Sequence, residues 1–120
     1  MKYLALILLF YSLGASASVP RECVQSKDEI NSALIVLADA TKAYIKRTGS
    51  FPGVWSSGLT EIIESSEKIV NVGGNIDPIE GDNAMQLSCF SFKDNSYSIY
   101  RINIKTYEVS FNQLFVKYGS

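Results

Sequence analysis

The acidic stretch between residues 77 and 83 contains the side chains best suited to hold a metal ion. It reads Asp77-Pro-Ile-Glu80-Gly-Asp82-Asn83, which brings several oxygen-bearing side chains into one short segment. Calcium takes six or more oxygen ligands, and a turn of this composition supplies some of them. The spacing does not match an EF-hand loop. We therefore expect a solvated turn here, with a calcium site at Asp77, Glu80 and Asp82 as the alternative.

The absence of histidine narrows the catalytic chemistry that the chain can perform. No Ser-His or Cys-His nucleophile pair can form, and the commonest general base is missing. Two cysteines are too few for a Cys₄ zinc site. A hydrolase would have to depend on Asp and Glu alone, and nothing in the sequence indicates a carboxyl group in an apolar pocket. The sequence therefore predicts a non-enzymatic protein without a cofactor.

The charge balance does not indicate a nucleic-acid partner. The chain has 11 Lys and Arg residues against 12 Asp and Glu residues, a net charge of −1. A nucleic-acid-binding domain is expected to be basic, with clustered Lys and Arg. We therefore expect the partner to be a protein.

Residues 1–17 predict a secretory signal peptide. Lys2 precedes an apolar run over residues 4–13, and Ala15-Ser16-Ala17 provides a small-residue cleavage site. The alternative is an uncleaved membrane anchor, but a helix over residues 3–17 would extend only roughly 22 Å, short of a hydrocarbon core of roughly 30 Å. We therefore expect an exported chain, periplasmic or secreted, in which residues 18–120 form one domain without stable membrane insertion.

Export suggests a structural role for the two cysteines. In an oxidising compartment two thiols most often pair with each other, so we expect a disulfide between Cys23 and Cys89. For a loop of this length the chain-entropy model assigns about 4 kcal/mol, less any strain in the folded state. A reactive or metal-binding thiol is the alternative. Because a small domain has on the order of 5–10 kcal/mol of stability in total, such a bond would matter for folding.

The strongest secondary-structure signal is a long amphipathic helix over about residues 27–48. Ser26 and Glu29 form a capping box at its start, and Gly49 with Pro52 ends it. A second, shorter helix is expected from Leu59 to about residue 67, and the Gly- and Pro-containing segment 73–83 is expected to be irregular. The apolar face of the long helix consists of Ile30, Ala33, Leu34, Leu37, Ala40, Thr41, Tyr44 and Ile45.

The C-terminal third predicts an antiparallel meander of strands. A two-residue turn at 105–106 pairs Tyr100 with Phe111, and a four-residue turn at 93–96 pairs Tyr100 with Cys89. Lys-Thr is not a favoured two-residue turn, so the second loop could be longer. The fold class is therefore α+β: a long helix and a short helix packed on a three- to four-stranded antiparallel meander. Both turns build one inner apolar face from Met85, Leu87, Cys89, Tyr100, Ile102, Ile104, Tyr107, Val109 and Phe111.

A second apolar group lies on the opposite face of the first hairpin. It consists of Phe90, Phe92, Tyr97 and Ile99, where a solvated sheet face should be polar. We expect the 114–118 tail or the 69–79 segment to cover this group. The alternative is that it contacts a partner.

The Gly-rich loop over residues 49–58 contains Phe51 and the only tryptophan, Trp55. We expect both side chains to fold back over the open end of the core, because a small core benefits from every large side chain. The alternative is that they anchor a protein partner, a common role of aromatic residues on loops.

The segment from the end of the long helix into this loop resembles the head domains of type IV pilins and type II secretion pseudopilins. Ala40, Tyr44, Gly49 and Phe51-Pro52 match an Ala-x-x-x-Tyr-x-x-x-x-Gly-x-aromatic-Pro pattern, and Gly58-Leu59 follows as in that family. The resemblance implies an antiparallel sheet packed on the helix. It also implies a possible calcium loop in the sheet region, for which only Asp77, Glu80 and Asp82 could correspond.

The chain departs from that family at its N-terminus. It lacks the prepilin-peptidase site and the apolar helix continuous with the head through which filaments assemble, and residues 18–26 are polar. The resemblance therefore implies a soluble pilin-like head, used as an accessory or binding module in a pilus or secretion system. A secreted inhibitor or immunity-type protein that blocks an enzyme, through a loop such as 51–58, is the alternative.

Overall fold

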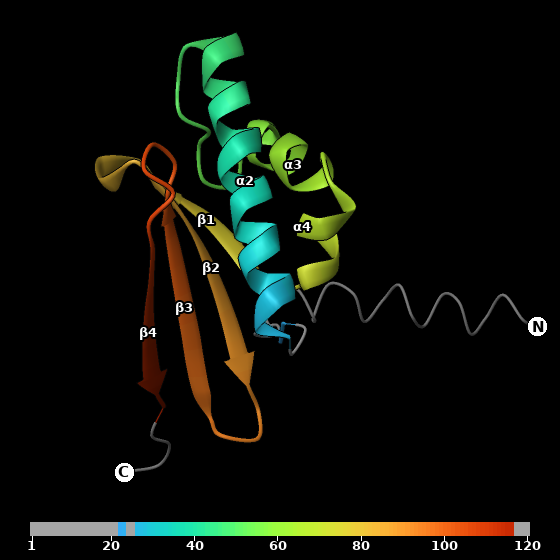
Figure 1. Ribbon diagram of the computed structural model, residues 1–120, viewed down its shortest axis with the longest axis vertical. Helices are drawn as coiled ribbons and strands as arrows, with labels where there is room; N and C mark the ends of the chain where they lie inside the picture. Colours follow the sequence, from blue (N-terminus) through green and yellow to red (C-terminus); the bar gives the residue numbers. More distant parts are fainter. Residues whose placement is uncertain (1–21, 24–25, 117–120) are drawn as a thin grey trace, which may run out of the picture.

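A long helix, α2 (Lys27–Thr48), forms the centre of the computed structural model, which describes residues 22–23 and 26–116 (Figure 1). Ser26 accepts a hydrogen bond from Glu29 N at the first turn. Gly49 adopts φ +85° at the other end and donates its N–H to Ile45 O. The helix therefore begins and ends where its capping residues predict.

Two short helices follow and pack beside α2: α3 (Ser57–Glu64) and α4 (Glu67–Val72). The sequence predicted one helix here. The structure has two because the chain turns at Ser65 and Ser66, and the Ser66 side chain accepts from Lys68 N to begin α4. Serine competes with helical hydrogen bonding in this way and favours helix ends.

Four antiparallel strands form one sheet in the order β1-β2-β3-β4. β1 lies in the segment that was expected to be irregular, so that prediction was wrong. Pro78 is tolerated there because β1 is an edge strand, where a missing backbone donor costs little. The elements are β1 (Asn75–Ile79), the 3-10 turn η1 (Glu80–Asp82), β2 (Ala84–Ser91), β3 (Ser96–Asn103) and β4 (Val109–Phe115).

The register of the second hairpin is the predicted one, with Tyr100 opposite Phe111. Its loop is longer than two residues, because Asn103 N donates to Glu108 O. In the first hairpin Tyr100 lies opposite Leu87 and not Cys89. That turn comes one residue earlier than predicted, with Asn95 at φ +53°, a conformation that Asn adopts readily. The shift in pairing is two residues, so the same side chains still share a face.

The core lies between α2 and the inner face of the sheet. Leu34, Leu37, Met85 and Ile102 are fully buried there, and α2 contacts β2 and β3. β4 lies at the far edge, away from the helices (Figure 1). A helix is about 10 Å across and strands are about 4.8 Å apart, so one helix covers about two strands. The expectation that Val109 and Phe111 lie under the helix was therefore wrong, and both are exposed.

The predicted disulfide joins Cys23 to Cys89, whose Cα atoms are 5.2 Å apart. Cys89 is buried on the inner face of β2, and Cys23 forms an isolated bridge with Gly73. The bond indicates an oxidising, extracytoplasmic compartment. The predicted signal peptide, residues 1–17, lies outside the described residues. Within the described ranges, no helix combines the length and the apolar character needed to cross a membrane.

Candidate protein-interaction sites

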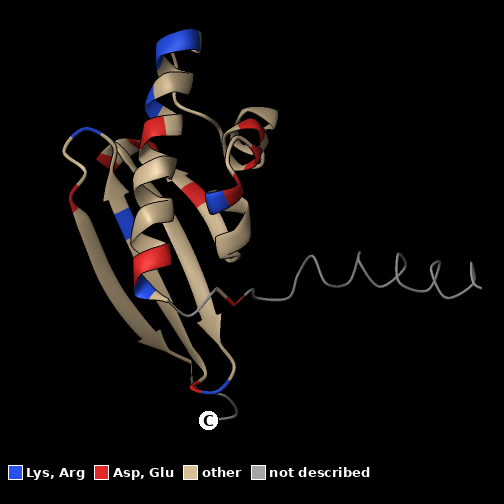
Figure 2. Cartoon of the chain, turned by 45° about the vertical axis from the view of Figure 1, so that its right-hand side comes forward, with Lys and Arg blue, Asp and Glu red and all other residues tan. Residues whose placement is uncertain are grey.

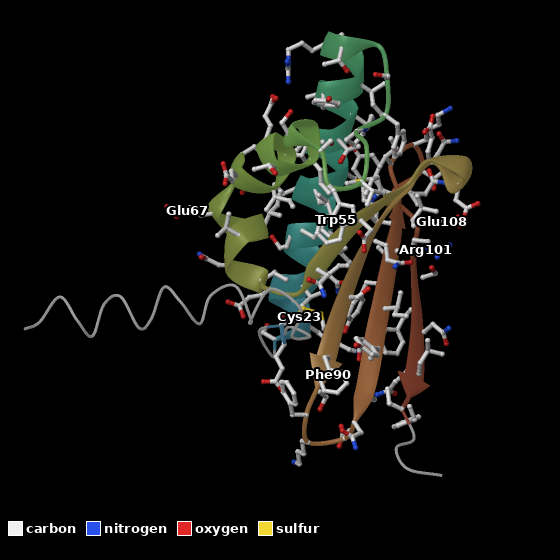
Figure 3. All side chains as sticks on the ribbon, turned by 180° about the vertical axis from the view of Figure 1, so that it is seen from behind. Cys23, Trp55, Glu67, Phe90, Arg101 and Glu108 are labelled. Carbon is white, nitrogen blue, oxygen red and sulfur yellow. A yellow bond between two sulfur atoms is a disulfide. The ribbon has the colours of Figure 1, made fainter. Side chains whose placement is uncertain are left out.

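Trp55 is the most exposed large hydrophobic residue in the described part of the chain, with 93% of its surface accessible. Tryptophan is usually well buried, so an indole in this position is unusual. Trp55 lies in the loop that joins α2 to α3, where Figure 3 labels it. The prediction that it folds back over the core was therefore wrong.

The loop that carries Trp55 is fixed at both of its ends. Phe51 is half-buried and packs against the core, as expected, and Pro52 is buried. On the other side, Ser56 Oγ donates to Gly53 O at 2.6 Å and accepts from Leu59 N at 3.1 Å. These contacts hold the short turn over residues 53–56 between the core and the first turn of α3.

The backbone of Trp55 is in the left-handed region, at φ +61°. Trp55 is the third residue of the turn that Ser56 N–H closes on Gly53 O, a position where a positive φ favours Gly or Asn. A bulky residue in this conformation is rare and costs of order 1 kcal/mol or more. The chain therefore places its only tryptophan where a glycine would be more stable, and exposes it. Neither feature stabilises the fold.

Three rings of the outer aromatic group pack against one another. Phe90 is only 4% exposed, and the rings of Phe92 and Tyr97 contact it edge-on, with ring centroids 4.8 and 4.9 Å away. Leu114 lies beside Tyr97 within the sheet and does not lie over it, and residues 117–118 of the expected covering tail are outside the described part. Ile99 is half-buried on the same face.

The other segment expected to cover this group lies elsewhere. α4 packs on α2 and α3, and β1 extends the sheet sideways. Phe92, at 56% exposure, is the group's main exposed member, and its N–H donates to Glu22 Oε2. Trp55 and Phe90 lie at different heights of the molecule, so the structure presents two separate apolar sites (Figure 3).

The acidic stretch does not gather its carboxylates. Asp77 is on β1, whereas Glu80 and Asp82 are exposed in η1. Asp82 Oδ2 pairs with Arg101 Nη1 at 3.0 Å, and Arg101 also donates to Gln86 Oε1. Across residues 22–23 and 26–116 no three His, Cys, Asp or Glu groups lie close enough to hold a metal ion. Calcium binding stays a prediction without geometric support.

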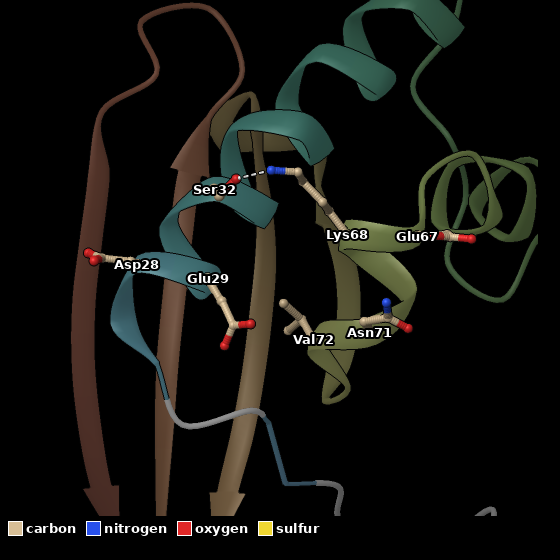
Figure 4. A pocket seen from close by; sticks show the side chains of 7 residues that line it. All are labelled: Asp28, Glu29, Ser32, Glu67, Lys68, Asn71 and Val72. Carbon is tan, nitrogen blue, oxygen red and sulfur yellow. Dashed lines mark hydrogen bonds between the residues drawn. The ribbon is translucent and has the colours of Figure 1, made fainter.

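Two open grooves flank α2. One, of about 390 Å³, lies between the N-terminal part of α2 and α4 (Figure 4). Glu29 points into it, whereas Asp28 and Glu67 point away on opposite sides, so the three carboxylates do not face one another. The other, of about 520 Å³, has Ile45 and Ile104 among its lining residues and is bordered by three lysines: Lys42, Lys46 and Lys105.

Sequence reasoning missed the exposed inner side of β4. Phe111 contacts the ring of Tyr100 at a centroid distance of 5.1 Å, and Lys27 Nζ lies 5.9 Å above the Phe111 ring. Partial burial raises the pKa of the Tyr100 phenol. The alternating pattern of β4 predicts a covered face, and only the position of α2 shows that it is not covered.

Compared with models of protein families, with curated proteins and with solved structures, the chain matches none. The resemblance to pilin heads therefore depends on its sequence motif and on the order of the elements.

Proposed function

We propose that this protein is an exported, non-enzymatic interaction module that binds a protein partner through Trp55. The observation that carries the proposal is the combination at this residue of near-complete exposure with a left-handed backbone. Backbone strain persists where the surrounding structure enforces it, and such positions cluster at functional sites. Tryptophan is also enriched among the residues that dominate binding energy at protein interfaces.

The loop defines the chemistry of the partner surface. Residues 49–58 contain no charged side chain, and the neighbouring Val54 is exposed beside Trp55. An indole with an adjacent aliphatic side chain fits an apolar pocket with few charges. Because hydrogen bonds hold the backbone of the turn, little backbone conformational entropy is lost when the indole binds.

The test is the effect of Trp55→Ala on a partner isolated from the extracytoplasmic fraction of the native host. We expect the dissociation constant to rise at least about 30-fold, which corresponds to about 2 kcal/mol at an interface hot spot. Val70→Ala, another exposed apolar residue, is the matched control and should change the affinity little. Equal binding by the wild type and Trp55→Ala would refute the proposal, and a loss with Phe92→Ala alone would move the site to the outer aromatic group.

Trp55→Gly separates binding from folding. Glycine adopts positive φ without strain, so the free energy of unfolding of this variant should be about 1 kcal/mol higher than that of the wild type. The variant should nevertheless lose the partner. Chemical denaturation measures the first effect and calorimetric titration the second. A destabilised Trp55→Gly variant would mean that the indole contributes to the fold, and would remove the basis of the proposal.

A role in a pilus or secretion system is the more specific form of this proposal. Its support is the helix-to-loop motif ending in Phe51-Pro52 and Gly58-Leu59, together with a helix followed by an antiparallel sheet. An extracytoplasmic partner that itself belongs to such an assembly would favour it.

A secreted inhibitor of an enzyme is the second candidate, because a projecting fixed loop suits insertion into an enzyme cleft. It predicts a one-to-one complex in which the activity of the bound enzyme is lost. A partner that has no catalytic activity, or keeps it when bound, would exclude this candidate.

A further inference from the structure

The two edges of the sheet differ in their protection against a further strand. β1 is short, contains Asp77 and Pro78, and is followed directly by η1. Charge, proline and short length are features by which edge strands resist pairing. β4 has none of them: it is longer, its sequence Val-Ser-Phe-Asn-Gln-Leu-Phe is uncharged, and its ribbon in Figure 2 is tan throughout. No strand among residues 22–23 and 26–116 pairs with its outer edge.

The backbone of β4 presents alternate residues at this edge. Asn103 N–H donates to Glu108 O in the ladder with β3. Bonded positions alternate along an antiparallel pair, so residues 110, 112 and 114 bond towards β3. Gln113 N–H donates to Asn112 Oδ1 at 2.9 Å, a local bond that a pairing strand would replace. The residues whose backbone groups point outward are therefore Val109, Phe111, Gln113 and Phe115.

The side chains of these same residues lie on the inner side of the sheet, beside the part that α2 covers, and Lys27 at the start of α2 reaches over the Phe111 ring. Val109, Phe111 and Phe115 are 44%, 53% and 67% exposed. Every residue of β4 is exposed. An uncharged edge strand with apolar side chains, with which no further described strand pairs, is a template for strand addition.

We propose that β4 pairs antiparallel with β4 of a second copy of this chain, about a twofold axis at Asn112, to form one continuous sheet. This register matches outward-facing residues with outward-facing residues. Val109 then lies opposite Phe115 of the second copy, Phe111 lies opposite Gln113, and Asn112 faces itself. The apolar side chains meet in the gap between the two α2 helices.

The residues of β4 favour a second copy of this chain as the source of the strand that pairs with its outer edge. A strand that fits should be uncharged opposite Phe115, because burying a charged side chain against this ring carries a desolvation cost. It must also be apolar at alternate positions and of equal length. β4 meets these conditions itself, and a twofold contact between identical strands closes without further growth. The exposed apolar side chains present on the order of 400 Å² per copy, which predicts a dimer at the weak end of specific interfaces.

Sedimentation of the intact, disulfide-bonded chain between about 10 µM and about 1 mM tests this proposal. We expect the mass to rise from one copy to two across this range. In Val109→Lys/Phe115→Lys the lysines face each other across the interface, so this variant should remain monomeric. Thr60→Lys/Asn71→Lys adds the same charge on α3 and α4 and should still dimerise. A wild type that stays monomeric, or a dimer that persists in Val109→Lys/Phe115→Lys, would overturn the proposal.

A cysteine pair tests the register. Asn112→Cys places two thiols opposite each other in a closely spaced, non-hydrogen-bonded pair, where an intermolecular disulfide can form. Ser110→Cys lies opposite Leu114 of the second copy and is the matched control. Rapid covalent dimerisation of Asn112→Cys alone supports the twofold axis at Asn112, and equal cross-linking of both variants contradicts it. Trp55→Ala should leave both results unchanged, so this proposal can fail independently of the partner site.

Discussion

The inner face of the sheet has two halves that follow the same sequence pattern and have different environments. Met85 on β2 and Ile102 on β3 are completely buried under α2, whereas Val109, Phe111 and Phe115 on β4 are exposed. All of these side chains point to the same side, because side chains alternate along every strand. Alternation therefore decides which face a side chain joins, but the position and width of the covering helix decide whether that face is dry.

The largest expected change in the free energy of unfolding comes from the covered half of the sheet, because Cys89 of the disulfide lies there on β2. Cys23→Ala/Cys89→Ala should lower the free energy of unfolding by about 4 kcal/mol, because the unfolded chain regains the freedom of a long loop. Urea denaturation measures this change. A reductant should destabilise the wild type by a similar amount and leave the double variant unaffected. A loss below about 1 kcal/mol would mean that the cross-link is not a main source of stability.

A matched pair of truncations tests the two halves directly. Met85→Ala should cost about 3 kcal/mol, because it leaves a cavity under α2. Phe115→Ala removes more atoms from β4 and should cost less than about 1 kcal/mol in the monomer, since the ring is already largely in water. Both values come from urea denaturation at low protein concentration. Equal losses would contradict the division of the sheet into covered and uncovered halves.

Two glycines extend the comparison to backbone contacts. A Cβ on Gly74, which has φ +75°, would lie 2.6 Å from Cys23 Sγ and 2.8 Å from Ser88 O, so Gly74→Ala should cost about 2 kcal/mol. Gly81 in η1 has open space around it, and Gly81→Ala should change stability by less than about 0.5 kcal/mol. Thermal unfolding of the two variants side by side measures the difference. Equal stabilities would mean that Gly74 is not tightly packed against Cys23 and Ser88.

The smallest effect concerns Tyr100, which lies between the two halves. Burial raises the pKa of its phenol above the ordinary value of 10.0. Below that pH the phenol is neutral in both states, so its full contribution to stability is present. Above it the unfolded chain loses this proton first, and the contribution is lost as the pH rises through the folded pKa. Urea midpoints measured from about pH 9 to about pH 11 should fall less steeply in Tyr100→Phe than in the wild type, and equal slopes would contradict this assignment.

The sequence predicted the elements whose causes are local. The caps of α2, Ser26 before it and Gly49 after it, could be predicted because the capping bonds reach only three or four residues along the chain. The shared face of β2, β3 and β4 follows from alternation, which tolerated the two-residue error in the first hairpin. The disulfide followed from there being two cysteines in a chain expected to be exported.

Tertiary structure decided the features that depend on distant segments. β1 exists because β2 supplies its hydrogen bonds, although the Gly- and Pro-containing segment around it predicts no strand. The ring of Tyr97 on β3 packs against Phe90 on β2, and Phe51 packs on the core and so holds one end of the loop that exposes Trp55. β4 is open because one helix covers about two strands. Each of these features depends on contacts with segments that are distant in the sequence, and no local pattern of residues specifies those contacts.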